Sequence, residues 1–206
     1  MYRQVLADLR ESYNRNAPNR DKKYGVEDWK IEVRQSFLSL IQKEGKQRLL
    51  EIGAGPGRDG KFFQECGLDV VCTDLSPEMV ALCRAKGLTA YVMDFLSLDF
   101  PAHSFDVVYA LNCLLHVPKD DFRLVLQSIQ GLLKAGGVFY LGVYGGRDFE
   151  GIWLEDTYSP KRFFSFHTDE QLKEIAAEFF EILGFKVIQL DGEADLHFQS
   201  VMLKRS

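Results

Sequence analysis

The sequence of 206 residues has few of the features that mark secreted, membrane or metal-binding proteins. Its four cysteines form no C-x-x-C pair, which argues against a zinc site or a redox motif and predicts free thiols in a reducing compartment. No apolar run approaches the roughly 20 residues that span a bilayer. The N-terminal residues also lack the apolar segment of a secretory leader. We therefore expect a cytoplasmic protein with no metal centre and no membrane partner.

The sequence also lacks an excess of positively charged residues. The sequence has 25 Lys and Arg residues against 30 Asp and Glu residues, a formal net charge of −5 and a pI of about 5.4. Surfaces that bind nucleic acid are usually basic, so we expect no nucleic-acid partner. The length and the ordinary globular composition, with 46% hydrophobic residues, predict one domain over residues 1–206. Either a monomer or a homodimer fits these data.

Strand and helix patterns alternate from residue 48 onward. Residues 1–45 have helical apolar spacing with a polar break at 14–23, and we interpret them as a helical cap on a core of residues 46–206. Apolar runs separated by helices predict parallel strands covered on both faces. These runs are 49–52, 70–73, 90–93, 105–110 and 138–143. A helix over about 168–183 then precedes strands at 185–190 and 197–203, which a turn at Asp191–Gly192 joins as an antiparallel hairpin.

A glycine-rich loop directly follows the first predicted strand. Gly53, Gly55 and Gly57 alternate with Ala54 and Pro56 before a predicted helix begins. Glycines let the backbone turn tightly and let a ligand approach the main chain, and a helix N-terminus offers free N–H groups. This stretch predicts a ligand-binding loop.

Two classes of ligand fit this loop. Gly55–Gly60 matches G-x-G-x-x-G, and Asp74 follows at the distance of a ribose-binding acid, which is typical of NAD(P)-dependent oxidoreductases. Glu51 and Asp59, however, place carboxylates where they would repel a pyrophosphate. Asp94 adds a third acid at a strand end, and ligands of open α/β sheets lie at those ends. These acids favour a ligand with a cationic end.

Taken together, these residues resemble a class I S-adenosylmethionine-dependent methyltransferase of the small-molecule, type 11 kind, over about residues 45–205. The resemblance implies a Rossmann-like sheet of seven strands, completed by the C-terminal hairpin, with the N-terminal helices as a variable cap. It implies S-adenosylmethionine as cofactor, with S-adenosylhomocysteine as product. It assigns the methionyl part to Glu51 and the glycine loop, the ribose to Asp74, the adenine to Leu75, Met79, Asp94 and Phe95, and the sulfonium side to Asn112 and Cys113.

The sequence indicates less clearly which residues of such a site would bind the methyl acceptor. His116 is a candidate general base because histidine titrates near working pH, although a packing role fits equally well. An aromatic segment at about 145–167 predicts either a substrate-side insertion or a small satellite core. The further substrate-side candidates are Tyr13 and Tyr24 in the cap, Tyr144, Arg147 and His167, with Lys161 and Arg162 beside the aromatic segment.

The expected reaction is direct in-line transfer of a methyl group to a small molecule that the sequence does not identify. Alignment of the reactants supplies most of the catalysis in such a transfer, so a general base is optional. The segment Asn112–Leu115 lacks the Asn-Pro-Pro-Tyr-like pattern of nucleic-acid methyltransferases. An NAD(P)-dependent oxidoreductase and a non-catalytic module that binds S-adenosylmethionine remain the alternatives.

Overall fold

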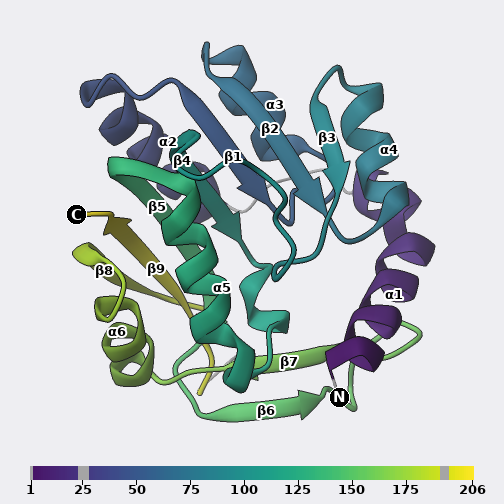
Figure 1. Ribbon diagram of the computed structural model, residues 1–206. Helices are drawn as coiled ribbons and strands as arrows, with labels where there is room; N and C mark the ends of the chain where they lie inside the picture. Colours follow the sequence, from purple (N-terminus) through teal and green to yellow (C-terminus); the bar gives the residue numbers. More distant parts are fainter. Residues whose placement is uncertain (1, 23–27, 191–194) are drawn as a thin grey trace.

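The computed structural model describes residues 2–22, 28–190 and 195–206. Its centre is a seven-stranded sheet in the order β3-β2-β1-β4-β5-β9-β8 (Figure 1). The five strands β3, β2, β1, β4 and β5 run parallel to one another. β9 is antiparallel to β5 and to β8. The strands are β1 (Arg48–Ile52), β2 (Asp69–Asp74), β3 (Thr89–Val92), β4 (Phe105–Leu111), β5 (Leu133–Gly145), β8 (Glu181–Gln189) and β9 (His197–Lys204).

This sheet confirms the Rossmann-like α/β fold and the antiparallel C-terminal strands predicted from the sequence. The predicted turn at Asp191–Gly192 and the candidate Tyr24 lie outside the described residues.

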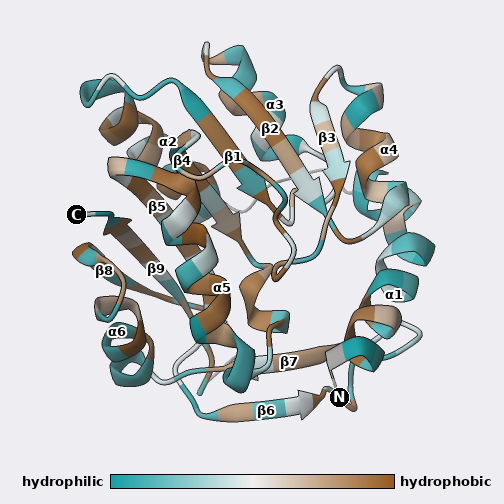
Figure 2. Cartoon of the chain, in the orientation of Figure 1, coloured by the Kyte–Doolittle hydropathy of each residue, from teal (hydrophilic) through white to brown (hydrophobic). Residues whose placement is uncertain are grey.

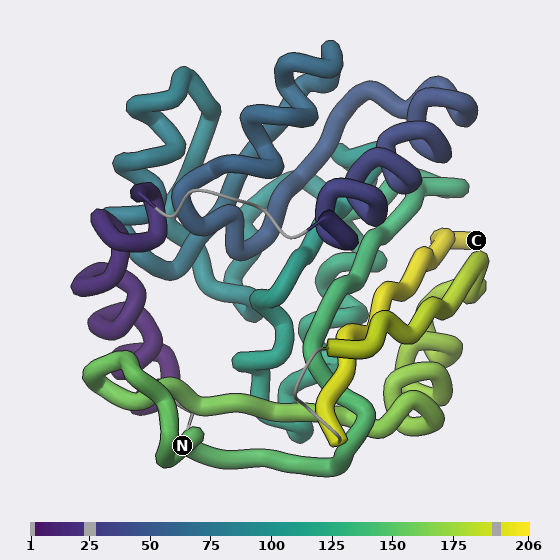
Figure 3. Tube along the Cα trace, turned by 180° about the vertical axis from the view of Figure 1, so that it is seen from behind, coloured from purple at the N-terminus to yellow at the C-terminus, as the bar shows by residue number. Residues whose placement is uncertain are grey.

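Helices cover both faces of the sheet. One face carries α2 (Asp28–Lys43), α3 (Arg58–Glu65) and α4 (Pro77–Ala85), and the other carries α5 (Lys119–Leu132) and α6 (Asp169–Ala177). Side chains alternate along a strand, so Val107 and Tyr109 of β4 pack with α2 and α3, while Val108 and Ala110 pack with α5. Figure 2 shows the apolar strands between these layers, and Figure 3 shows the sheet from behind.

Two helix starts follow the local chemistry of the sequence. The Ser76 hydroxyl accepts a hydrogen bond from the N–H of Met79, and Pro77 takes the first helical position of α4. Thr168 and Gln171 form a reciprocal capping box at the start of α6. Ser and Thr are among the residues preferred at this position, so both helix starts follow from local sequence.

The N-terminal helix is longer than the sequence predicted. α1 (Tyr2–Lys22) continues through the expected polar break and through Pro18. Tertiary contacts hold this part of the helix: the Ser76 hydroxyl donates to Asn14 Oδ1 at 2.6 Å, and Arg58 Nη2 donates to the carbonyl of Arg20 at 2.6 Å. These contacts compensate for the missing proline N–H.

The last helix, in contrast, is shorter than predicted. α6 ends at Ala177, residues 178–180 turn the chain, and residues 181–183, which were expected to be helical, enter β8 instead. Phe180 turns into the core, where its ring lies 5.5 Å from that of Phe139. Glu181 pairs with Lys204 of β9, so strand pairing overrides the helical spacing there.

The aromatic segment forms a small sheet of its own, which the sequence did not predict. β6 (Phe149–Ile152) and β7 (Phe163–Phe166) pair antiparallel, with Phe149 opposite Phe166. This sheet lies beyond the carboxyl ends of the central strands, close to α1 (Figure 1). Leu9 of α1, Leu75 and Phe163 of β7 share one apolar cluster that joins these parts.

None of the helices in the described parts of the chain is long and apolar enough to cross a membrane.

Candidate functional site

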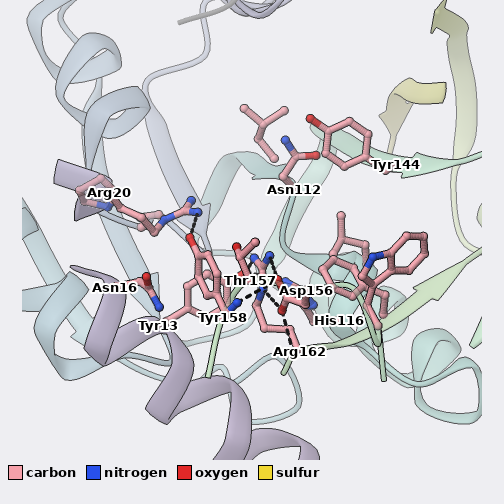
Figure 4. A pocket seen from close by; sticks show the side chains of 18 of the residues that line it. Tyr13, Asn16, Arg20, Asn112, His116, Tyr144, Asp156, Thr157, Tyr158 and Arg162 are labelled. Carbon is pink, nitrogen blue, oxygen red and sulfur yellow. Dashed lines mark hydrogen bonds and ion pairs between the residues drawn. The ribbon is translucent and has the colours of Figure 1, made fainter. Parts of the chain in front are cut away.

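A cavity of about 990 Å³ opens at the carboxyl ends of β1 and β4, between α1 and the β6–β7 sheet (Figure 4). A pocket of this size lies at the upper end of the usual range for ligand sites, roughly 300–1,000 Å³. A second cavity of about 50 Å³ adjoins it and reaches toward β2. The predicted residues that line one or both cavities are Tyr13, Glu51, Gly53, Ala54, Gly55, Asp59, Asp74, Leu75, Phe95, Asn112, Cys113, His116, Tyr144 and Arg162.

The glycines of the loop have different roles. Gly53 and Gly55 both have positive φ angles, 66° and 54°. A Cβ on Gly53 would lie 2.3 Å from Cβ of Cys113, so the turn requires glycine there for packing. A Cβ on Gly55 would meet only Arg20 Nη2, at 3.8 Å, among the described residues. Gly55 is therefore the position where a ligand can approach the main chain.

Gly57 is required for packing within the protein and not for contact with a ligand. It precedes α3 with φ 78°, and a Cβ there would lie 2.8 Å from Leu88 and 2.9 Å from the Cys83 sulfur. Gly57 lines neither cavity. The glycine loop therefore packs against α4 on the side away from the cavity, and this packing fixes which face of the loop lines the cavity.

The Glu51 carboxylate lies buried beneath the loop. It accepts from the backbone N–H of Gly60 and from the Cys72 thiol at 3.4 Å. Burial, together with repulsion from Asp59, raises the pKa of Glu51 well above its ordinary value. Asp59 itself accepts a hydrogen bond from Arg34 Nη1 at 2.8 Å. Glu51 therefore supports the start of α3 as well as lining the cavity.

Asp74 ends β2 and faces the loop. Its Oδ2 accepts from the N–H of Gly55, and its Oδ1 accepts from the N–H of Ser76, both at 2.8 Å. Each carboxylate oxygen keeps a free lone pair, so this arrangement can accept two hydroxyl groups from a ligand. Burial raises the pKa of Asp74, against the opposing effect of these N–H groups.

The residues predicted for adenine are not all at the cavity. Phe95 lines the smaller cavity, beside Leu75. Asp94 lines neither cavity, and its Oδ1 accepts from the N–H of Leu96 at 2.8 Å in a local turn. Met79 is fully buried in α4 and also lies outside the lining.

Asn112 has the geometry of a ligand-facing residue. Its φ is 55°, its N–H donates to the carbonyl of Gly142 at 2.7 Å, and its side chain lines both cavities. Its buried Oδ1 has no hydrogen-bond partner among the described residues. Buried polar atoms are almost always paired, so a ligand is the natural partner for this oxygen. Cys113 instead donates its thiol to the carbonyl of Ile52 and packs on Gly53.

His116 lies in a 3₁₀ turn (Leu114–His116) after β4 and forms a pair with Tyr13 of α1. Its Nδ1 lies 2.7 Å from the carbonyl of Phe163, which requires a proton on Nδ1. Its Nε2 therefore accepts the hydroxyl proton of Tyr13, at 2.6 Å. Burial lowers the pKa of His116 to about 3, so the ring is neutral at neutral pH. The pair joins two segments that are 103 residues apart in the sequence.

Arg162 orients this pair. Its Nη1 donates to the Tyr13 oxygen at 3.2 Å, and its Nε and Nη2 both donate to the Asp156 carboxylate at 2.9 Å. Asp156 holds the pKa of Arg162 above its usual range, against the effect of burial. Arg162, predicted beside the aromatic segment, is therefore an internally paired cation.

Arg20 is a site residue that the sequence reasoning missed. It lines both cavities, lies over Gly55 and donates to the Tyr158 hydroxyl at 3.4 Å. Its Nε is buried with no hydrogen-bond partner among the described residues. Tyr13, Asn16 and Arg20 all line the larger cavity and recur at helical spacing, a signal hidden by the assumed polar break.

Three further substrate-side candidates have different positions. Tyr144 lines the larger cavity and packs against Phe198, with ring centroids 5.6 Å apart. Arg147 lies behind the aromatic segment, 5.2 Å from the ring of Trp153, and His167 is buried against Phe122. Neither Arg147 nor His167 lines a cavity.

The described residues contain no group of three or more His, Cys, Asp or Glu side chains that could hold a metal ion.

Comparison with known proteins gives a family match for part of the core. Residues 49–137 match the family model described as a methyltransferase domain. A ubiquinone biosynthesis O-methyltransferase of Xanthomonas euvesicatoria pv. vesicatoria is 30% identical over 117 residues, which are 53% of this chain and 48% of that protein. Phosphoethanolamine N-methyltransferase 3 of Arabidopsis thaliana is 30% identical over 115 residues, 52% of this chain and 23% of that protein. The chain spans less than half the length of these relatives.

A solved structure supports the fold over the whole chain. The 1,6-didemethyltoxoflavin-N1-methyltransferase of Burkholderia thailandensis was crystallised with 1,6-didemethyltoxoflavin and S-adenosylhomocysteine bound. It is similar with a TM-score of 0.73 and 23% identity, over 100% of this chain and 89% of that chain. Of the ligand classes that the glycine loop left open, the family match favours the methyl donor over a nicotinamide dinucleotide.

Proposed function

We propose that this chain, whose residues 49–137 match the methyltransferase domain model, transfers a methyl group from S-adenosylmethionine to a small molecule. The observation that carries the proposal is the pair of adjoining cavities that share Gly55, Asn112, Tyr13 and His116, with Asp74 lining the smaller one. Residues suited to the cofactor and a proton acceptor therefore line the same two cavities.

The residues present fit S-adenosylmethionine. Gly55 leaves room above the loop, and Asp74 has lone pairs available for two ribose hydroxyls. The unpaired Nε of Arg20, over Gly55, suits the carboxylate of the methionyl end. The unpaired Oδ1 of Asn112 suits an N–H donor or the sulfonium. Leu75 and Phe95 offer apolar surface for the adenine in the smaller cavity.

When bound, S-adenosylmethionine supplies a methyl group that is already activated on sulfur. The main task of the chain is then to hold the acceptor atom in line with that methyl group. Positioning of this kind can contribute roughly 7–11 kcal/mol to catalysis. α1 and the β6–β7 sheet form two walls of the larger cavity, on either side of the place for the acceptor.

Tyr13 and His116 provide a path for the proton that the acceptor loses. Tyr13 donates to His116 Nε2, and it can accept a new proton from the acceptor on its own oxygen. The carbonyl of Phe163 keeps the proton on Nδ1, so Nε2 remains the accepting atom. Arg162 holds the Tyr13 oxygen in place.

We further propose that the chain acts as one domain, as a monomer or homodimer in the cytoplasm. The four free thiols, three of them buried, support a reducing compartment.

Calorimetric titration with S-adenosylhomocysteine, run beside NADH, tests the proposed function. We expect micromolar binding of S-adenosylhomocysteine and no measurable binding of NADH. Binding of NADH alone would replace this proposal with an oxidoreductase. Binding of S-adenosylhomocysteine without methyl transfer to any member of a broad acceptor panel would favour a non-catalytic binding module.

A further inference from the structure

An aromatic wall closes the acceptor end of the larger cavity. Trp153, Phe164 and Phe166 line it, and each pair of these rings has centroids between 5.7 and 6.1 Å apart. Arg147 packs behind the wall, outside the cavity lining, with its guanidinium 5.2 Å from the centre of the Trp153 ring. The planes of the three rings are tilted by between 46° and 70° to one another, so the wall is a packed, preformed aromatic surface on which one ring face can meet a ligand.

Flat groups continue from this wall to the Tyr13–His116 pair. The ring of Phe164 lies 4.8 Å from that of His116. The Arg162 guanidinium lies 3.8 Å from the centre of the Tyr158 ring and 5.1 Å from that of Phe164. Figure 4 shows His116, Tyr158 and Arg162 gathered at this end of the cavity. A planar ring seated on these surfaces would bring a ring substituent to the Tyr13 hydroxyl.

The charges at this end do not suit an acidic phosphate group. Arg162 is the one cation among the described lining residues that follow β4. Its Nε and Nη2 are paired with Asp156 and its Nη1 with Tyr13. Glu155 adds to the same lining a carboxylate with no ion pair among the described residues. Arg20 is the other cation near Tyr13, and the proposed function assigns it to the carboxylate of the cofactor. With Arg20 so occupied, a phosphorylated acceptor would meet more negative than available positive charge here.

The basicity of His116 also restricts which molecules can serve as methyl acceptor. Burial lowers the pKa of His116 to about 3, which makes it a weak base. A weak base serves an acceptor whose proton is already acidic, such as a phenol or the N–H of an electron-poor ring. Aliphatic alcohols would hold their protons too strongly, and protonated aliphatic amines would add a second positive charge beside the sulfonium.

We infer that the acceptor is a planar aromatic or heteroaromatic molecule with an acidic O–H or ring N–H, seated on Trp153, Phe164 and Phe166 with that group at Tyr13. This inference rests on the proposed function. The acceptor oxygen or nitrogen forms the new bond to the methyl carbon, and the electron pair of the carbon–sulfur bond stays on sulfur. The acceptor's proton passes to the Tyr13 oxygen while the Tyr13 proton passes to His116 Nε2.

Fragment binding to the protein saturated with S-adenosylhomocysteine tests this inference. The probes are catechol, its saturated counterpart trans-cyclohexane-1,2-diol, and phosphoethanolamine, each measured by ligand-observed NMR. We expect catechol to bind at least about 5-fold more tightly than either of the others, as aromatic contacts of this kind allow.

Two matched variants locate the binding surface. Trp153→Leu removes a ring of the wall, and we expect it to weaken catechol binding roughly 2- to 10-fold. Trp29→Leu makes the same change at a half-buried tryptophan that lines neither cavity and packs on Phe198. It should leave catechol binding unchanged. Neither variant should change the affinity for S-adenosylhomocysteine.

The outcomes separate this inference from the proposed function. Equal binding of catechol and the diol, tighter binding of phosphoethanolamine, or no binding of catechol to the complex with S-adenosylhomocysteine would each overturn the aromatic acceptor. Equal losses in the two tryptophan variants would overturn it as well. Failure of S-adenosylhomocysteine itself to bind would instead refute the proposed function, and this inference with it.

Discussion

The two ends of the cavity are built in different ways. The cofactor end comes mainly from residues 51–113, with Arg20 of α1 beside the glycine loop. Hydrogen bonds of the backbone, such as Gly55 N–H to Asp74, largely fix this loop and the two strand ends. The acceptor end joins α1 to residues 153–166 through side chains, among them Tyr13, His116 and Arg162. The acceptor end can therefore change by substitution while the cofactor end keeps its geometry.

Substitution of Tyr13 by Phe should have the largest effect and should be confined to the acceptor end. It removes the hydroxyl between the acceptor and His116 but keeps the ring. We expect kcat to fall about 10²-fold or more, the usual contribution of a positioned base. The affinity for S-adenosylhomocysteine should change less than about 2-fold, because a phenyl ring still fills the same space.

The double variant with His116→Gln sharpens this test. Because the two residues act as one unit, the double variant should be little slower than either single variant. Fully multiplicative losses, or a loss of cofactor affinity equal to the loss of turnover, would remove Tyr13 and His116 from the proposed proton path.

Substitution of Asp74 by Ala should instead weaken binding at the cofactor end. The affinity for S-adenosylhomocysteine should fall roughly 10- to 150-fold, since a hydrogen bond to a charged group contributes about 1.5–3 kcal/mol. Asp69→Ala is the control, because Asp69 is exposed at the other end of β2 and forms only a surface ion pair with Arg48. Calorimetry of both variants checks this, with circular dichroism to confirm folding. An unchanged affinity in Asp74→Ala would refute the assignment of the ribose hydroxyls to Asp74.

A pair of glycine substitutions tests the rigidity of the cofactor end. Gly45 and Gly53 have the same φ of 66°, but a Cβ on Gly45 meets no atom of the described residues within 4 Å. Gly45→Ala should cost about 1 kcal/mol of backbone strain. Gly53→Ala adds the clash with Cys113 and should cost about 1–3 kcal/mol more. Urea unfolding measures both, and equal costs would mean that the loop can shift.

A further prediction concerns the pH dependence of stability. Burial lowers the pKa of His116 to about 3, so between pH 3 and 6.5 the unfolded chain binds a proton there that the folded chain does not. Its contribution to stability is complete above pH 6.5 and falls as the pH drops, by at most about 1.4 kcal/mol per unit. The stability difference between wild type and His116→Gln should shrink over this range. A difference independent of pH would mean that His116 is not held neutral.

The same contrast explains what the sequence could predict. The sheet, the caps at Ser76 and Thr168, and the loop from Gly53 to Asp74 follow from local patterns of apolar residues, glycines and caps. The placement of Asp74 beside Gly55 also follows, because the carboxyl ends of adjacent parallel strands meet at one edge.

The acceptor end could be predicted only in part. His116 and Tyr13 were candidates, but no local pattern shows that they meet across 103 residues. Arg20 lay in a segment interpreted as a break, although tertiary contacts keep α1 helical there. The pairing of β6 with β7 depends on aromatic contacts with the core, and not on an alternating pattern within either strand.

A crystal structure with S-adenosylhomocysteine bound is the most direct test of the central claim that one cavity joins a cofactor end to an acceptor end. The account predicts ribose hydroxyls on Asp74, main-chain contact at Gly55, and the sulfur atom facing the Tyr13–His116 pair across the larger cavity. A ribose away from Asp74, or a sulfur atom walled off from His116, would contradict the account.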